Sequence, residues 1–421
     1  MERYSEYKDS GIQWLGEIPG HWKTVRVKAL LSERVDKSDT GLEEPLSMSQ
    51  KYGIIPTKEM DVVPNMASTF IGAKRVFKRD LVFNKLKAHL GVFAISKYDG
   101  LVSPDYAVYT PNERTYLPFM EYVFHTPLYI GEFTRRATGV AIGLTRLYTN
   151  GLFAIPFLYP PIEEQHSIVS YLDDKCGKID KMLEGKQKQI ELLAEMKQRI
   201  IADAVTRGLN PDVKMKATNI PWLPEIPEHW EEQRMATLFT GDIEVNKDFE
   251  YKRAFKFNYG QLVPKNEIGE PEDYREVYVK YSKIKQGDIL VNGLNLNYDF
   301  ISQRVACAPS DGIITSAYVV CRPRKDINYE YYTYLFKGMD SMKLFHGMGT
   351  GIRLTLSFKE MKKQILPIPP HSEQHDIVSY IKERSVKIDI LTSKLQQEIE
   401  SIKEYKQRLI SDVVTGQIKV C

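Results

Sequence analysis

The chain contains an internal duplication, and this feature limits its possible folds more than any other. The segment WLGEIPGHW, Trp14 to Trp22, returns as WLPEIPEHW, Trp222 to Trp230, a shift of 208 residues that uses all four tryptophans. A second match, shifted by 209, aligns residues 160–206 with residues 369–415, and 23 of the 47 aligned positions are identical. Self-similarity at a fixed period is typical of a repeated structural unit. We therefore expect two copies of one unit in tandem.

Between these markers the similarity is faint. The segment RDLVFN at 79–84 corresponds to GDILVN at 287–292, and the Thr-Gly pair at 138–139 corresponds loosely to the one at 350–351. Each half thus combines a strongly repeated frame with a diverged interior. This pattern indicates that the frame does the same job twice, whereas the interiors do two versions of one job.

A long helix is predicted after each Pro-Pro pair, at 160–161 and at 369–370. Apolar residues there recur with a period near 3.5, which is typical of a helix that packs along one seam. About 40 residues of helix would span roughly 60 Å. Gly177 and Gly185 stand where the second copy has Val386 and Lys394, so we expect the first helix to bend or break there. The seams are Ile168, Leu172, Ile179, Leu183, Ile190, Leu193, Ile200 and Ala204, and Ile377, Ile381, Ile388, Leu395, Ile399, Ile402, Leu409 and Val413.

The expected fold class is α+β. The two long helices are each other's obvious partners, and they would pair as an antiparallel coiled coil with pseudo-twofold symmetry. The interiors alternate Val-, Ile-, Phe- and Tyr-rich runs with turn residues, which indicates two mixed α/β domains in tandem. Helices are predicted at 119–136 and 329–346. The expected segments are a domain at 1–160, a helix at 161–210, a domain at 211–369 and a helix at 370–421.

Composition places the chain among ordinary globular proteins. Its 421 residues exceed what one core usually organises, and 43% of them are hydrophobic and 27% charged. No run of about 18 apolar residues and no signal-peptide core occurs, which predicts a cytoplasmic protein without membrane segments. The cysteines at 176, 307, 321 and 421 form no CxxC pair, which argues for reduced thiols and against structural zinc.

The duplicated motifs resemble those of a known family, the specificity (S) subunits of type I restriction-modification systems. The resemblance rests on the doubled Trp-Leu-x-Glu-Ile-Pro-x-His-Trp opening, the Asp-Leu/Ile segment near 80 and 288, the Thr-Gly loop, and the entry Pro-Pro-x-x-Glu-Gln-His-x-Ile-Val-x-Tyr to each helix. It covers essentially the whole chain. Each motif alone is weak, but their doubled order at a fixed offset is specific.

This resemblance implies two target-recognition domains, each of which reads one half of a split, asymmetric sequence in double-stranded DNA. It also implies that the helices act as spacers and dock two methyltransferase (M) subunits, which a restriction-translocase (R) subunit joins. S-adenosylmethionine, ATP and Mg²⁺ would then belong to these partners and not to this chain. Two identical M subunits need equivalent docking surfaces, and an asymmetric target needs two different readers.

The first candidate for DNA contact is the densest basic stretch of the first domain. The net charge of +3 is small, so any DNA-binding face must be local. Clustered Lys and Arg neutralise phosphates, while Asn and Arg can pair with base edges in the major groove. The alternative is a solvated strand edge. The candidates are Lys74, Arg75, Lys78, Arg79, Asn84, Lys85, Lys87 and His89, and their neutral, amide-rich counterparts are Asn292, Asn295 and Asn297.

Two further segments are candidates for DNA contact. A glycine-rich loop at 347–353 has a counterpart around 135–146, and glycines let a backbone approach phosphates closely. No Gly-Lys-Ser/Thr follows, so this is not a nucleotide-binding loop. A basic-aromatic patch lies at 251–256. A flexible surface turn remains the alternative for these segments. Their candidate residues are Arg135, Arg136, Arg146, Thr350, Gly351 and Arg353, with Lys252 and Arg253 from the patch.

The entry to each long helix carries a Gln-His pair, Gln165-His166 and Gln374-His375, which we interpret as helix-entry or subunit-docking residues. His371 and His375 have the i, i+4 spacing of zinc ligands. The first copy has Ile162 where His371 stands, so a metal shared by both halves is excluded and no metal site is expected.

We expect no catalytic residues, because the chain has neither an Asn/Asp-Pro-Pro-Tyr/Phe methyltransferase motif nor a Walker sequence. Two other functions stay open at this point. A coiled-coil scaffold would bind no nucleic acid at any salt concentration. A self-contained nuclease would cleave DNA alone in the presence of Mg²⁺.

Overall fold

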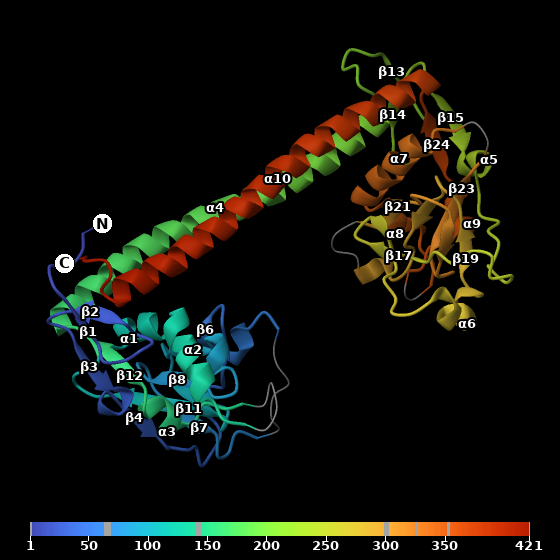
Figure 1. Cartoon of the computed structure of the whole chain (residues 1–421). Helices are drawn as coiled ribbons and strands as arrows, with labels where there is room; N and C mark the ends of the chain where they lie inside the picture. The colour runs from blue at the N-terminus through green and yellow to red at the C-terminus, as the bar shows by residue number, and fades with distance from the viewer. Residues whose placement is uncertain are drawn as a thin grey trace. The chain divides into compact units, whose positions relative to one another are not determined.

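The computed structural model describes residues 2–62, 69–139, 145–298, 303–324, 327–351 and 354–420. The chain divides into two compact units, residues 1–186 with 397–421, and residues 187–396. Each unit holds one globular domain and a part of both long helices, α4 (Ile162–Arg207) and α10 (His371–Val414) (Figure 1). No helix in the described ranges is long and apolar enough to cross a membrane.

The first globular domain is built on a four-stranded antiparallel sheet with the order β4-β11-β8-β9. Four two-stranded antiparallel pairs surround it: β1 with β2, β3 with β12, β5 with β6, and β7 with β10. The strands are β1 (Tyr7–Asp9), β2 (Glu17–Pro19), β3 (Lys23–Arg26), β4 (Leu31–Arg34), β5 (Leu46–Ser49), β6 (Gly53–Pro56), β7 (Lys74–Val76), β8 (Leu81–Asn84), β9 (Phe93–Ile95), β10 (Gly100–Val102), β11 (Tyr106–Pro111) and β12 (Pro156–Tyr159). The helices are η1 (Val27–Ala29), η2 (Thr57–Glu59), η3 (Ala88–Leu90), α1 (Leu117–Phe124), α2 (Pro127–Arg136) and α3 (Thr149–Phe153).

The second domain repeats this plan. Its central sheet has the order β16-β23-β20-β21, and β13 pairs with β14, β15 with β24, β17 with β18, and β19 with β22. The strands are β13 (Met215–Ala217), β14 (Glu225–Pro227), β15 (Glu231–Arg234), β16 (Phe239–Thr240), β17 (Phe255–Asn258), β18 (Gln261–Pro264), β19 (Ser282–Ile284), β20 (Ile289–Val291), β21 (Val305–Cys307), β22 (Gly312–Ile314), β23 (Val319–Pro323) and β24 (Ile365–Ile368). The helices are α5 (Met235–Leu238), η4 (Pro271–Tyr274), α6 (Arg275–Tyr278), η5 (Leu296–Tyr298), α7 (Tyr329–Ser341), α8 (Leu344–Met348) and α9 (Phe358–Met361).

Each central sheet separates two apolar clusters, because successive side chains of a strand point to opposite faces. In β8, Leu81 and Phe83 pack with α1 and α2, whereas Val82 packs with the β5–β6 hairpin. In β20, Ile289 and Val291 pack with α7, and Leu290 packs with the β17–β18 hairpin. The faint sequence similarity of the interiors thus corresponds to the same three-layer arrangement in both halves.

The long helices pair in antiparallel fashion, as predicted. In the first unit Lys406 Nζ lies 2.6 Å from Asp180 Oδ1, and in the second unit Lys197 Nζ lies 2.8 Å from Asp389 Oδ1. These two ion pairs are related by the 209-residue shift. The α4 seam continues at spacings of three and four through Cys176, Ile179, Leu183, Lys186, Ile190, Leu193, Lys197 and Ile200, all at least partly shielded from solvent. The expected fold class, with its pseudo-twofold repeat, is confirmed.

Three local expectations were wrong. The helix α4 does not break at Gly177 or Gly185, because packing along the whole seam outweighs the low helix propensity of glycine. The helix expected at 119–136 is two helices, with Thr126 as N-cap and Pro127 as the first residue of α2. The helix expected at 329–346 ends at Ser341, and Lys343 adopts a left-handed φ of 59° before α8 begins. The four segment boundaries stay a prediction.

Both ends of the chain lie in the first unit and are tied together there. Lys419 N donates to Glu2 O at 2.9 Å, and the Tyr7 hydroxyl donates to Gly416 O at 2.9 Å. Gly416 (φ 76°) lies against Pro19 and Trp22, as Gly208 (φ 73°) lies against Pro227 and Trp230 in the second unit. In the first unit, the residues after α10 and those before Trp22 therefore take the position that the residues after α4 take in the second unit.

Candidate nucleic-acid interface

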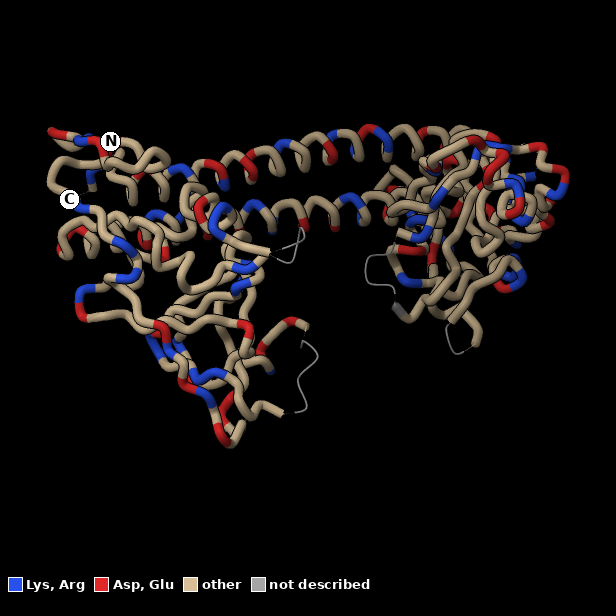
Figure 2. The backbone as a smooth tube through the Cα atoms, turned by 60° about the horizontal axis from the view of Figure 1, so that its bottom comes forward, with Lys and Arg blue, Asp and Glu red and all other residues tan. Residues whose placement is uncertain are grey.

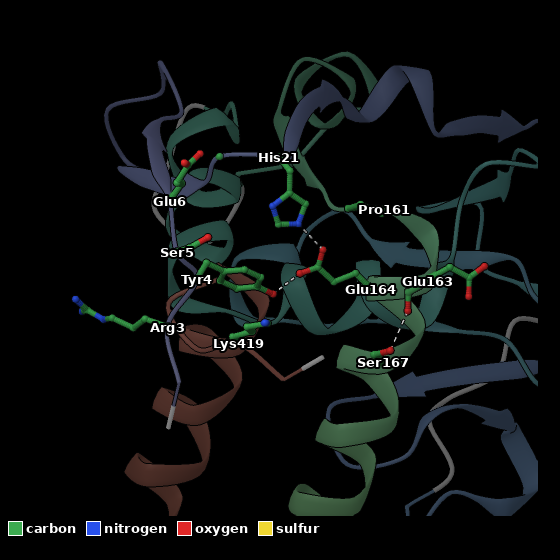
Figure 3. A pocket seen from close by; sticks show the side chains of 11 residues that line it. Arg3, Tyr4, Ser5, Glu6, His21, Pro161, Glu163, Glu164, Ser167 and Lys419 are labelled. Carbon is green, nitrogen blue, oxygen red and sulfur yellow. Dashed lines mark hydrogen bonds and ion pairs between the residues drawn. The ribbon is translucent and has the colours of Figure 1, made fainter.

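The repeated frame anchors each domain to the first turn of its long helix. In the first unit Glu164 accepts hydrogen bonds from His21 Nε2, at 2.8 Å, and from the Tyr4 hydroxyl (Figure 3). In the second unit Glu373 accepts from His229 Nε2 at 2.7 Å and from Trp230 Nε1 at 3.0 Å. The histidine–glutamate hydrogen bond thus occurs at equivalent positions in both halves. A contact that recurs in both halves serves the shared fold.

A cavity of about 600 Å³ opens beside the first of these anchors, and Figure 3 shows the side chains around it. Arg3 and Lys419 line it together with three carboxylates, Glu6, Glu163 and Glu164. Such an excess of acidic groups does not suit a DNA backbone, because phosphates need clustered positive charge. The cavity belongs to the frame and not to a DNA-reading surface.

The comparison of the two halves also shows that Arg75 makes a repeated ion-pair contact, and the contact of Lys74 and Arg75 with DNA stays a prediction. Arg75 in β7 pairs with Glu43 at 2.8 Å and with Asp36 at 3.2 Å. Its counterpart in β19, Lys283, pairs with Asp248 at 2.8 Å and Glu250 at 2.7 Å. The Lys74 ammonium donates to Tyr106 O at 2.7 Å. A basic side chain held by acidic neighbours in both halves is a frame contact.

The ionisation of these residues follows from their partners. Hydrogen bonds from Ser38 and Arg75 lower the pKa of Glu43 to about 2, and hydrogen bonds to Asp248 and Glu250 raise the pKa of Lys283. Burial, together with repulsion from Lys85, lowers the pKa of Lys74. Arg75 and Lys283 are thus neutralised locally, which leaves little positive field for a phosphate.

Asn84 and Asn292 also make one repeated contact. Asn84 Oδ1 accepts from Leu86 N at 3.1 Å, and Asn292 Oδ1 accepts from Leu294 N at 3.2 Å. Asn side chains commonly stabilise turns in this way. Both amide oxygens therefore shape the turn that leaves the central strand, and the predicted base contacts fall to the residues that follow.

In the first domain, the two candidate segments lie side by side. Leu147 N donates to Lys85 O at 3.0 Å, and Thr138 and Arg146 exchange backbone hydrogen bonds of 3.0 and 2.9 Å. Arg146 also lies 3.4 Å from Asp105. We call residues 84–91, 138–139 and 145–147 the first loop pair. Its exposed and half-buried basic side chains are Lys85, Lys87, His89 and Arg146.

The second domain brings the corresponding segments together, with different chemistry. Leu356 N donates to Gly293 O at 2.8 Å, Leu296 N donates to Leu354 O at 3.2 Å, and Thr350 pairs with Thr355. We call residues 292–297, 349–351 and 354–356 the second loop pair. Asn295 and Asn297 are exposed on it, and Gly351 has a φ of 77°. Arg353 lies outside the described residues.

The remaining basic candidates differ in their availability. Arg135 pairs with Glu132 at 2.8 Å, Arg136 also pairs with Glu132, and Lys252 pairs with Glu272. The Arg253 guanidinium lies 5.4 Å from the centre of the Phe255 ring. Lys78 and Arg79 are exposed, and Arg79 has a left-handed φ of 72° where the second half has Gly287. The contact of each of these residues with DNA stays a prediction.

The two helix-entry glutamines are buried, at 1% and 5% exposure. Gln165 Nε2 donates to Pro160 O, and Gln374 Nε2 donates to Pro369 O, both at 2.9 Å. These side chains tie the helix to the preceding strand and have little surface to offer a partner. His166, which stacks 3.9 Å from the Tyr116 ring, and His375 are exposed. Docking of a partner subunit at these four residues therefore stays a prediction, and the exposed histidines are better placed for it than the buried glutamines.

One residue that contacts the second loop pair is absent from the sequence candidates. Arg304, only 8% exposed, donates from Nη1 to the carbonyls of Asn292 and Leu294 and from Nη2 to that of Asn295. Sequence analysis passed over it because it is a single basic residue beside an apolar strand. The only signal was its place close after the amide-rich segment.

Comparisons with known proteins agree with the resemblance of the duplicated motifs. The family model described as "Type I restriction modification DNA specificity domain" matches residues 255–401. The putative type I restriction enzyme MjaX specificity subunit of Methanocaldococcus jannaschii is 22% identical over 96% of this chain and 96% of its own length. The chain is thus similar to specificity subunits of type I restriction-modification systems. The resemblance of the duplicated motifs is confirmed.

Further relatives and solved structures are similar to this chain. The EcoBI specificity subunit of Escherichia coli is 22% identical over 62% of this chain and 57% of its own length. A solved structure from work on complex assembly and conformational transition of the type I R-M system has a TM-score of 0.66 at 14% identity, over 95% of this chain and 99% of the other. The HsdS subunit of Thermoanaerobacter tengcongensis gives a TM-score of 0.49 at 15% identity, over 95% and 98%. The structure with the higher score shares the fold.

The family model describes a DNA specificity domain, and the relatives are named specificity subunits of type I restriction enzymes. The prediction that the chain has no catalytic centre of its own agrees with these names.

Proposed function

We propose that this chain is the specificity subunit of a type I restriction-modification complex and that each of its globular domains reads one half of a split, asymmetric DNA target through its own loop pair. One observation carries the proposal: the same seven strand pairings recur in order in both domains, while the loop pairs at the ends of β8 and β20 differ in charge, length and composition. Between the bridged residues, Thr138 and Arg146 enclose seven residues, whereas Thr350 and Thr355 enclose four. A shared frame with two different loop pairs suits two readers of unlike half-sites.

The chemistry of the loop pairs suggests how the two readers differ. Lys85, Lys87 and Arg146 of the first loop pair suit phosphate contacts and the acceptor edge of guanine. Asn295 and Asn297 of the second loop pair suit adenine, whose N6 and N7 match the donor and acceptor of an amide. The first domain should therefore contribute more of the salt-dependent affinity, and the second more of the discrimination by hydrogen bonds.

The finer roles of the helices are part of the same proposal. The helices α4 and α10 would set the distance between half-sites and dock two identical M subunits, with His166 and His375 among the contacts, and an R subunit would join through them. S-adenosylmethionine, ATP and Mg²⁺ would be bound by these partners, and the complex would act on chromosomal DNA in the cytoplasm. Charges of both signs alternate along both helices (Figure 2), a pattern that suits a protein partner better than DNA.

Co-expression of this chain with the methyltransferase of its operon, followed by mapping of methylated adenines in host DNA, tests the proposal. We expect one split motif. Insertion of seven residues after Gln189 and seven after Gln397 keeps the 3.5-residue seam in register and lengthens each helix by about 10 Å, or about three base pairs. The gap in the motif should then grow by about three base pairs while both halves stay unchanged.

In a matched control, the seven existing residues that follow Gln189 and the seven that follow Gln397 are exchanged for another heptad sequence without a change in length. This control should leave the gap unchanged. An unaltered gap after the insertion would contradict the spacer role. If the complex binds no DNA at low salt, the coiled-coil scaffold takes precedence, and plasmid cleavage by the chain with Mg²⁺ alone would point to a nuclease.

A further inference from the structure

Arg304 lies inside the turn that carries the amide side chains of the second loop pair. Its Nη1 donates to Asn292 O at 2.9 Å and to Leu294 O at 2.8 Å, and its Nη2 donates to Asn295 O at 3.2 Å. The backbone of Arg304 is fixed as well, because its N donates to the buried carboxylate of Asp340 at 2.8 Å. The guanidinium thus holds three carbonyls of one short turn.

These carbonyls need such a donor because the turn has left the central sheet. A buried carbonyl without a partner costs free energy, and a planar guanidinium offers several donors in a fixed fork. Asn295 has a left-handed φ of 49°, a backbone conformation that residues other than glycine adopt with strain. Arginine is therefore suited to keep this turn in one shape, and lysine, with its single flexible ammonium, is not.

The neighbours of the turn restrict it from the other sides. The Leu296 side chain is fully buried in the core, and a Cβ atom at Gly293 would collide with the Leu356 carbonyl oxygen. Arg304, Leu296 and Leu356 hold the turn, and its exposed side chains are those of Leu294, Asn295 and Asn297. The two amides are consequently presented from a rigid base, as recognition by hydrogen bonds requires.

The first domain solves the same problem without an arginine. Asn84 N donates to Val92 O at 3.0 Å where Asn292 N donates to Arg304 O at 2.8 Å, so Val92 is the counterpart of Arg304. The turn there closes on itself, because Lys87 N donates to Asn84 O at 3.0 Å, and η3 follows. Arg304 is thus absent from the repeated frame and specific to the second domain.

We propose that Arg304 is a positioning residue that determines which bases the second domain reads, by fixing the turn that carries Asn295 and Asn297. This inference rests on the proposed function of the second loop pair as a reader of one half-site. Arg304 itself need not touch DNA, since its guanidinium is turned toward the turn's own carbonyls.

The test uses the full chain in complex with its methyltransferase, with methylated adenines mapped in host DNA for each variant. Arg304→Lys keeps the charge and loses the fork. Asn295→Gly removes the exposed amide and keeps the left-handed backbone, which glycine adopts without strain. We expect both variants to relax the same half of the motif, with a loss of discrimination against single mismatches on the order of ten-fold. The double variant should lose no more than either single one.

Arg322→Lys is the matched control, because Arg322 is a half-buried arginine of the central sheet whose hydrogen bonds go to Asp288, at 2.8 Å, and to the Lys283 carbonyl. It should lower the thermal unfolding temperature and leave both halves of the motif intact. This separates a positioning role from a general loss of stability.

A split motif in the wild type with an unchanged motif in Arg304→Lys would overturn this inference and leave the proposed function standing. Equal relaxation of both halves in Arg304→Lys would also overturn it, since that result indicates a structural role alone. A wild-type complex that methylates no split motif would instead overturn the proposed function. Relaxation confined to the half affected by Asn295→Gly, with Arg322→Lys unaffected, supports the inference.

Discussion

The two globular domains have the same strand order and differ most where chain segments leave the central sheet. Asp80 and Asp288 each accept a backbone hydrogen bond of 2.8 Å, from Phe77 N and Lys285 N, and each pairs with an arginine. The loop pairs have no such agreement, because one presents lysines around a short 3₁₀ helix and the other presents amides over a buried arginine. Duplication therefore separates contacts that maintain the fold from residues free to acquire a new specificity.

The frame also varies in the source of its arginines. Asp80 pairs with Arg34 from the edge strand β4, whereas Asp288 pairs with Arg322 from the neighbouring inner strand β23. The carboxylate is thus repeated in both domains, whereas the arginine that pairs with it comes from a different strand in each. The feature common to both halves is the acceptor of the turn before the central strand, and that turn sets the direction of the strand and of the loop after it.

Removal of these carboxylates should have the largest effect on stability and tests whether the two frames are equivalent. Asp80 and Asp288 are 2% and 1% exposed, so Asp80→Ala and Asp288→Ala each leave a half-buried arginine unpaired. We expect a loss of about 3 kcal/mol in each domain. Hydrogen exchange of peptides that cover β8 and β20 measures the two domains separately.

Asp99→Ala and Asp311→Ala are suitable controls, because these exposed carboxylates also accept one backbone hydrogen bond each, from Lys78 N and Gln286 N. Their effect should be much smaller. A large loss in one domain and none in the other would break the equivalence of the frames.

The paired tryptophans offer a second, smaller test of the same comparison. Trp22 and Trp230 are both fully buried, but Trp230 Nε1 donates to Glu373, whereas Trp22 Nε1 has no hydrogen-bond partner in the described structure. Trp→Phe at either position removes a similar apolar area. Trp230→Phe should therefore cost about 1.5 kcal/mol more than Trp22→Phe in chemical unfolding, the value of a hydrogen bond to a charged group. Equal losses would mean that the Trp230 bond contributes nothing net.

Much of this architecture could be predicted from the sequence, because the repeat and the apolar period are global patterns. The tandem domains, the long helices and their antiparallel pairing follow from the shift of 208 and 209 residues and from the 3.5-residue period. The polar seam positions Lys186 and Lys197 could not be found this way, since a hydrophobic pattern has no place for a lysine that reaches Glu398 or Asp389 on the other helix.

The candidate site was harder to predict, for a similar reason. Arg75 looked like part of a basic cluster, but its carboxylate partners, Asp36 and Glu43, lie more than 30 residues earlier in the chain. Only the fold decides which charges meet. The sequence did identify the segments that form both loop pairs, because glycines, asparagines and lysines there break the strand pattern, and the structure brings the members of each pair together.

The difference between the two loop pairs can be measured through the dependence of DNA affinity on salt. Each phosphate contact contributes a slope of about 0.9 in log K against log salt. The double variant Lys85→Ala, Lys87→Ala should have a slope that is smaller by about 1.8. Its loss of affinity between 50 and 200 mM salt should therefore be roughly ten-fold smaller than that of the wild type. Asn295→Ala with Asn297→Ala should leave the slope unchanged and weaken only the specific site.

Titrations of the assembled complex with specific and unrelated duplexes provide this measurement. If the asparagine pair changes the slope as much as the lysine pair, the two loop pairs do not differ in kind, and the contrast between a cationic and an amide reader is wrong.

The smallest expected effect concerns the long helices, where the repeat is broken by two glycines in α4 alone. Gly177 and Gly185 are exposed and helical, and a Cβ atom at either position would meet no atom within 4 Å. Gly177→Ala and Gly185→Ala should each stabilise α4 by up to about 1 kcal/mol, since alanine restricts the unfolded chain more and adds no clash. Val386→Ala and Lys394→Ala, at the matching positions of α10, should change stability by much less. If the glycine variants gain stability and the methylation motif keeps its gap, the helices act as passive spacers. If stability rises while methylation falls, flexibility of α4 is itself needed, and the two helices of the frame are not equivalent.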